Sequence, residues 1–92
     1  MTIHKLQLQL NPRTRTLLPK DSIILCVQAQ HDIPTIWYAF DERHSGTDDV
    51  CFALLTTGFP EDLEGNFKYV GTFQLGGGNF IGHVYCDGVV RN

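Results

Sequence analysis

The sequence predicts an all-β protein, either a small antiparallel sandwich or a partly open barrel of about six strands. Three observations favour this fold class. Segments in which apolar residues occupy every second position recur along the chain, and each has the length of a strand. Clusters of Asn, Asp, Gly and Pro separate these segments. The only helix-like stretch, residues 59–66, is long enough for at most one short helical turn.

The first two strands are expected at residues 4–10 and 22–30. Residues 4–10 alternate apolar and polar side chains, which indicates a half-buried strand. Residues 22–30 begin with apolar side chains on both faces, which predicts an end that is buried on both sides. Residues 11–21 are expected to form a connection, because Asn11–Pro12 is a turn signal and Pro19 cannot donate a backbone hydrogen bond.

Four further strands are expected at residues 35–41, 50–58, 69–75 and 79–86. The last two flank three consecutive glycines, Gly76–Gly78. A phosphate-binding loop would place a helix directly after such glycines, whereas residues 79–86 have a strand-like pattern. We therefore expect the glycines to close a β-hairpin.

Two more glycines, Gly71 and Gly82, lie inside these last two expected strands. A glycine within a strand admits a β-bulge or the close approach of a neighbouring side chain. Trp37 is the candidate for such a neighbouring side chain.

Length and composition indicate a single domain, residues 1–92, that is neither disordered nor embedded in a membrane. No apolar run approaches the length of a membrane span. The N-terminal segment lacks the continuous apolar core of a signal peptide. The three cysteines (Cys26, Cys51 and Cys86) are an odd number and far apart, so we expect them to be reduced. A cytoplasmic location follows from these features.

Charge is distributed unevenly. Residues 41–64 contain seven acids and one base, a net charge of −6, whereas the first 20 residues contain four bases and no acid. Such clusters are ordinary on solvated loops, and they also suit a partner-facing acidic patch. The acids proposed to face a partner fall on two loops, and they are Asp48, Asp49, Glu61, Asp62 and Glu64. Because about eight extended residues separate the loops, roughly 26 Å, we expect them at opposite ends of one strand.

No motif for catalysis, cofactor binding or metal binding is recognisable, so we expect a protein that is not an enzyme and has no cofactor. His4 and His83 are interpreted as hydrogen-bonded core or edge residues. A zinc site built across strands from His83 and the three cysteines is the alternative. Arg13, Arg15 and Lys20 could contact a phosphate backbone, but a pI of about 5.7 argues against free DNA binding.

Three stretches, TIHKLQLQL, LPKDSIILCVQAQHDIPTIWYAFD and YVGTFQLGGGNFIGHVY, resemble a family of short, uncharacterised domains common in bacteriophage genomes. The resemblance implies a phage origin and the family's fold, and it implies no activity. Small acidic phage proteins of this kind include inhibitors of host defence, so the size and charge are similar to those of an anti-CRISPR protein acting on a type I surveillance complex.

The leading hypothesis is therefore an inhibitor in the cytoplasm of a bacterial host. Its acidic loops would meet lysines that normally hold target DNA, and its basic residues would reach the guide RNA of the same complex. Phe59 and Leu63 are the candidate anchors if they are exposed. One alternative is a self-associating protein that sequesters a host nucleotide signal in a pocket of Trp37, Tyr38 and Arg13. Another is an accessory structural domain of the phage.

Overall fold

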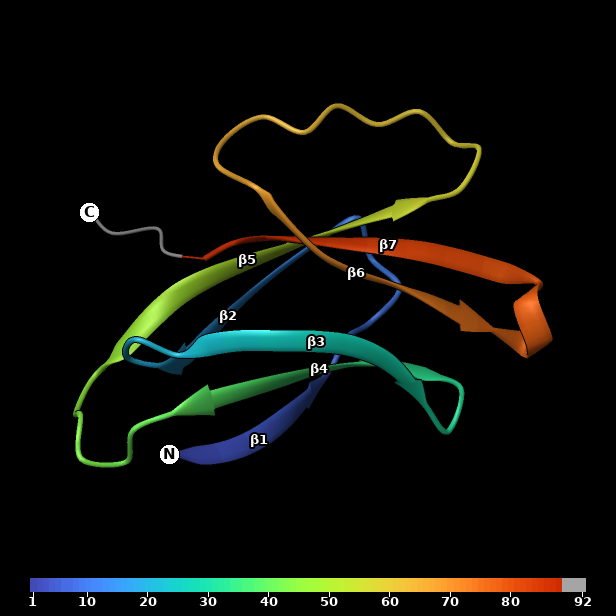
Figure 1. Ribbon diagram of the computed structural model, residues 1–92. Helices are drawn as coiled ribbons and strands as arrows, with labels where there is room; N and C mark the ends of the chain where they lie inside the picture. The colour runs from blue at the N-terminus through green and yellow to red at the C-terminus, as the bar shows by residue number, and fades with distance from the viewer. Residues whose placement is uncertain (89–92) are drawn as a thin grey trace.

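The computed structural model describes residues 1–88, which form two antiparallel sheets packed face to face (Figure 1). The three-stranded sheet has the order β1-β4-β3, and the four-stranded sheet has the order β2-β5-β7-β6. The expected all-β antiparallel sandwich is confirmed, and the sheets do not close into a barrel. The strands are β1 (Thr2–Gln7), β2 (Arg13–Pro19), β3 (Ile23–Gln30), β4 (Ile33–Phe40), β5 (Thr47–Thr56), β6 (Lys68–Leu75) and β7 (Phe80–Asp87).

Strand β2 corrects the expectation that residues 11–21 form a connection only. It pairs along its whole length with β5, from Arg13 opposite Ala53 to Pro19 opposite Thr47. Proline is tolerated here because β2 is an edge strand and Pro19 is its last residue. Leu18 is buried and Leu17 is exposed, as the period of a half-buried strand requires.

The short helical turn lies elsewhere than expected. Residues 59–66 contain no helix, and the one helical turn within residues 1–88 is a 3-10 turn over Gly76–Gly78. This turn joins β6 to β7, so the predicted hairpin is confirmed. Gly76 and Gly77 adopt φ angles of 58° and 67°, which glycine reaches without steric cost. The backbone N–H of Gly76 donates to Asp32 Oδ1 at 2.8 Å, which joins this hairpin to the turn between β3 and β4.

The core lies between the two sheets. Ile36, Phe52 and Val84 are at most 1% exposed, and they come from the central strands β4, β5 and β7. Strand β3 is an edge strand, and Ile23 and Leu25 at its beginning are 53% and 47% exposed. The expectation that this end is buried on both sides is therefore wrong, because in a two-layer sandwich each sheet has only one face covered by the other sheet.

Both strand glycines permit a close approach. A Cβ atom on Gly82 would lie 2.5 Å from Cζ of Phe73, its partner on β6. A Cβ atom on Gly71 would lie 2.9 Å from Cγ1 of Val27, which belongs to the other sheet. The bulge expected in this region lies between Tyr69 and Gly71. The approaching side chains are Phe73 and Val27, and not Trp37.

Candidate functional site

The acidic residues lie in two regions at opposite ends of β5. One region, residues 41–49, leads from β4 into the beginning of β5. The other, residues 57–67, connects β5 to β6 and is drawn in Figure 1 as a wide arc above the four-stranded sheet. We call residues 57–67 the arch. The arch and the region 41–49 therefore form two separate charged surfaces.

Arg13 holds the arch against the four-stranded sheet. Its Nη2 donates to the backbone oxygen of Asp62 at 3.1 Å and lies 3.5 Å from Oε1 of Glu61. Its guanidinium group lies over the ring of Phe67, 5.6 Å from the centroid, which is a cation–π geometry. Its Nη1 donates to the backbone oxygen of Pro12 at 2.9 Å. Arg13 and Glu61, both expected to face a partner, thus also contact each other within the protein.

The arch carries an exposed aromatic side chain and two exposed carboxylates. Phe59 is 73% exposed, so it meets the condition set for a candidate anchor. Leu63 is half-buried. Asp62 and Glu64 are exposed, and neither carboxylate has an ion pair or hydrogen bond to any residue in the described range 1–88. These three exposed side chains are available for an external contact.

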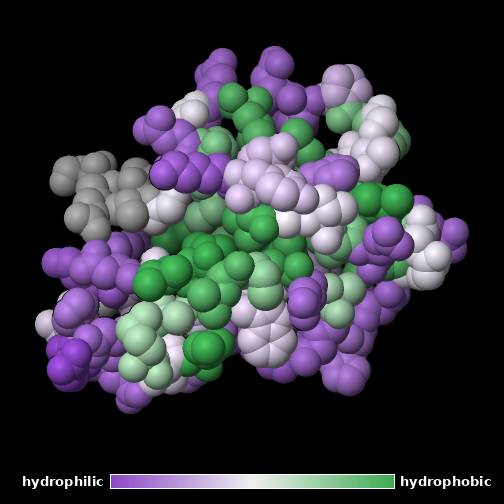
Figure 2. Space-filling view, in the orientation of Figure 1, coloured by the Kyte–Doolittle hydropathy of each residue, from purple (hydrophilic) through white to green (hydrophobic). Residues whose placement is uncertain are grey.

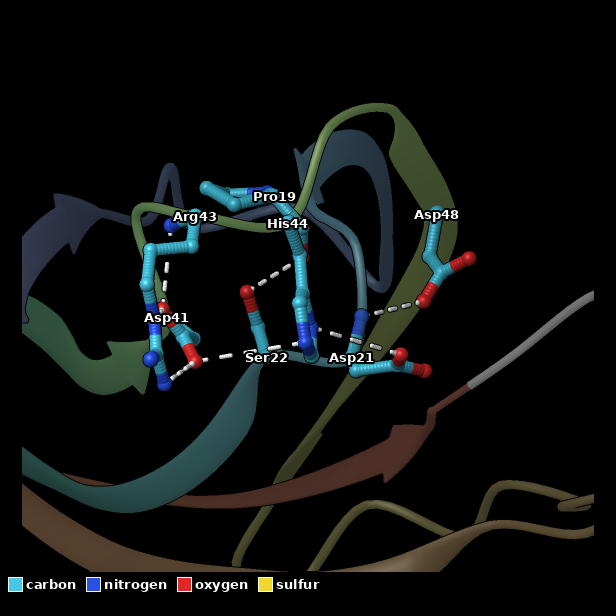
Figure 3. A network of polar contacts seen from close by, with 7 residues as sticks. All are labelled: Pro19, Asp21, Ser22, Asp41, Arg43, His44 and Asp48. Carbon is cyan, nitrogen blue, oxygen red and sulfur yellow. Dashed lines mark hydrogen bonds and ion pairs between the residues drawn. The ribbon is translucent and has the colours of Figure 1, made fainter. Parts of the chain in front are cut away.

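Two acids of the region 41–49, Asp41 and Asp48, belong to a polar network (Figure 3). Arg43 donates to Asp41 through Nε at 3.0 Å, Nη2 at 2.8 Å and the backbone N–H at 2.9 Å. The side-chain hydrogen bond from Arg43 lowers the pKa of Asp41 from 3.8 to about 2. His44 lies 3.9 Å from the carboxylates of both Asp41 and Asp21. Asp48 accepts a hydrogen bond from the backbone N–H of Asp21 at 2.9 Å, so this carboxylate joins the beginning of β5 to the turn that follows β2.

The remaining expected site residues lie along β2 and the turn that follows it. Arg15 forms an ion pair with Asp49 at 3.3 Å, and both side chains are partly exposed. Lys20 is exposed and has no ion pair within residues 1–88, while its backbone N–H donates to Gly46. Of the eight residues expected to face a partner, Lys20, Asp62 and Glu64 therefore keep unpaired charges.

One cluster was not predicted as part of a site. His83 on β7 contacts Thr57 Oγ1 through Nε2 at 2.6 Å and Thr72 Oγ1 through Nδ1 at 2.9 Å. The hydroxyl groups of Thr72 and Tyr69 lie 2.5 Å apart. His83 thus connects Thr57, at the beginning of the arch, with Thr72 on β6, the strand that follows the arch. No spacing in the sequence predicts the cluster, because its members come from the arch, β6 and β7, which meet only in the folded sheet.

The residues of the nucleotide-pocket alternative do not share one surface. Adjacent residues of a strand point to opposite faces. Tyr38 is accordingly part of the buried core, whereas Trp37 has the amine of Lys5 at 5.5 Å from its ring centroid. Arg13 lies on the other sheet beneath the arch.

The zinc alternative is also contradicted by the described residues. Among residues 1–88, no group of three or more His, Cys, Asp or Glu side chains is arranged to hold a metal ion. The three cysteines carry free thiols, and burial raises the pKa of Cys86 to about 11. No helix in the described part of the chain is long and apolar enough to span a membrane.

Comparisons with known proteins identify a family and no activity. Neither a curated protein nor a solved structure matches the chain. A family model described as a domain of unknown function, DUF7352, matches residues 1–91. This match covers nearly the whole sequence, and the chain therefore belongs to the DUF7352 family.

Proposed function

We propose that this protein is a non-catalytic inhibitor that docks through the arch on a basic surface of a host nucleoprotein complex. The observation that carries the proposal is the exposed Phe59 on the same loop as two unpaired carboxylates, Asp62 and Glu64. An exposed aromatic side chain is a typical anchor of a protein interface. Carboxylates on the same loop attract lysines and arginines, which accelerates association and selects a basic partner.

Arg13 contributes by holding the arch in one arrangement before binding. A loop that is already ordered loses less conformational entropy when it docks, and this favours affinity. Lys20 and Arg15 lie on β2 or just after it and would reach RNA backbone exposed in the same complex. The partner we propose is a type I CRISPR surveillance complex, whose DNA-binding lysines the arch would occupy. The phage-like sequence pattern and the acidic arch support this choice.

The test uses a purified type I surveillance complex with its guide RNA and a fluorescent target DNA. Addition of the protein should abolish DNA binding, measured by fluorescence anisotropy. Phe59→Ala should weaken inhibition by at least about tenfold, which corresponds to roughly 1.4 kcal/mol. The double variant Asp62→Asn/Glu64→Gln should weaken inhibition mainly by slowing association.

Glu42→Lys is the matched control. It changes the net charge by the same amount as the double variant, but it lies in the region 41–49, outside the arch. This control should inhibit like the wild type. Undiminished DNA binding at saturating protein, or equal effects of the control and the arch variants, would rule out docking through the arch.

A further inference from the structure

A groove opens between the edge strands of the two sheets, at the end where β3 and β6 begin. It has a volume of about 690 Å³, within the range of ligand pockets. Ile24, Val50, Val70 and Cys86 contribute buried or half-buried apolar side chains. Figure 2 shows an apolar band between the upper part of the molecule and the three-stranded sheet, in the place where Figure 1 shows this end of β3 and β6.

The groove has a specific structural cause. Strands β3 and β6 touch where Val27 packs on Gly71, since a Cβ atom on Gly71 would lie 3.8 Å from the backbone N and O of Val27. Toward their beginnings both strands are bulged, between Ile24 and Cys26 in β3 and between Tyr69 and Gly71 in β6. A bulge bends a strand and increases its twist. Two edge strands that are bulged at the same level therefore diverge and leave the groove.

The walls of the groove offer apolar side chains and strand edges together. Ile23, Leu25 and Tyr69 line it and are 53%, 47% and 59% exposed. Among residues 1–88, β3 pairs only with β4 and β6 only with β7, so each wall has one edge without a strand partner. A ligand that fits must cover apolar side chains and also satisfy backbone N–H and C=O groups.

We propose that this groove binds an extended peptide segment of a partner protein, with large apolar side chains at alternate positions. An extended peptide matches both requirements, because its backbone pairs with a strand edge and its alternate side chains enter an apolar groove. The charges agree with a peptide, since the groove carries one base, Lys68, and one acid, Asp87. Because these two charges cancel, the groove suits the uncharged backbone of a peptide and does not select an anionic ligand. The inference is independent of docking through the arch.

The test is selection of nine-residue peptides from a random display library on the immobilised protein. The enriched peptides should carry apolar residues at alternate positions. A synthetic copy of the best peptide should shift the backbone amide NMR signals of residues 22–25 and 68–70. Leu25→Glu, which places a charge in the groove, should weaken binding of this peptide by at least about tenfold.

Leu17→Glu is the matched control. Leu17 is 64% exposed on edge strand β2 and does not line the groove, so this variant should bind the peptide like the wild type. The proposal is overturned if no peptide is enriched, or if Leu25→Glu and Leu17→Glu bind the peptide equally. It is also overturned if the groove binds only a small apolar dye. A wild-type dimer that Leu25→Glu converts to a monomer would instead assign the groove to a second copy of this chain.

Discussion

Among the glycines of residues 1–88, Gly82 is the one at which an added methyl group should destabilise the fold most. Its partner Phe73 covers it, and Phe73 in turn stacks on Phe80 with ring centroids 6.1 Å apart. Gly82→Ala places a Cβ atom 2.5 Å from Cζ of Phe73, so the ring must move in a packed core. We expect a loss of about 1–3 kcal/mol in the free energy of unfolding, measured by urea denaturation.

Two variants separate this clash from a general effect of replacing glycine. Gly88→Ala, where no atom of residues 1–88 lies within 4 Å of the new Cβ, should leave the free energy of unfolding nearly unchanged. Gly82→Ala should cost less when Phe73→Leu is also present, because leucine lacks the ring atoms that the methyl group meets. Strictly additive costs in the double variant would contradict the proposed contact.

Asp41 provides a prediction on pH. Its folded pKa is about 2, below the ordinary 3.8, mainly because Arg43 donates a side-chain hydrogen bond to it. A lowered pKa stabilises the fold above the ordinary value, and this contribution is lost as the pH falls from about 4 to about 2. Arg43→Gln should raise the pKa of Asp41 toward 3.8, as followed by NMR titration of its carboxyl carbon. An unchanged titration midpoint would show that Arg43 is not the cause.

Among the elements, the arch is held near its middle by Arg13 of β2, which contacts Glu61, Asp62 and Phe67. Removing the guanidinium group in Arg13→Gln should release the arch while leaving the two sheets intact. Proteinase Glu-C cleaves after glutamate, and Glu61 and Glu64 both lie in the arch. We expect cleavage there to accelerate by about tenfold, because local opening governs proteolysis.

Arg15→Gln is the control for this prediction, because it changes the charge equally on the same strand. Arg15 contacts Asp49 and not the arch, so its replacement should leave the cleavage rate unchanged. Equal acceleration in both variants would show that charge, and not the contacts of Arg13, determines the order of the arch.

The elements also show what the sequence predicts well. Six of the seven strands within residues 1–88 overlap a predicted one, because alternating, aromatic or largely apolar runs bounded by turn signals mark them. Strand β2 is missed because Pro12 and Pro19 surround it, and only its place at a sheet edge makes them acceptable. The exposure of Ile23 and Leu25 depends on strand order, which a local pattern does not contain.

On the scale of the whole molecule, four of the eight residues expected to face a partner form ion pairs with each other: Arg13 with Glu61 and Arg15 with Asp49. The ion pairs of Arg13, Arg15 and Arg43 are all partly exposed, and such pairs contribute little to stability. We therefore expect the thermal midpoint to change little between about 0.05 and about 0.5 M NaCl. Association with a basic partner should slow markedly over the same range, as stopped-flow fluorescence would measure. A midpoint that falls steeply with salt would contradict this picture.

The residue types of the candidate site could be predicted from the sequence, but the contacts between them could not. The sequence indicates which loops are acidic and that Phe59 is a possible anchor. It does not indicate that Arg13 contacts Glu61 or that Asp48 accepts from the backbone of Asp21, because these contacts join segments distant in the chain. The groove was not predicted either, since it results from two bulges and one glycine contact between sheets.

The hydrogen bond between Asp32 and Gly76 has a mechanical consequence. It connects the two sheets at the end where β3 and β6 finish. The Val27–Gly71 contact lies between this end and the end that holds the groove. Separation of the layers is thus easiest at the open end, with the glycine contact as the pivot. Asp32→Ala removes this hydrogen bond, so we expect the β3–β4 and β6–β7 turns to move apart. The width of the groove at the opposite end of β3 and β6 would then change, although no residue that lines it was replaced.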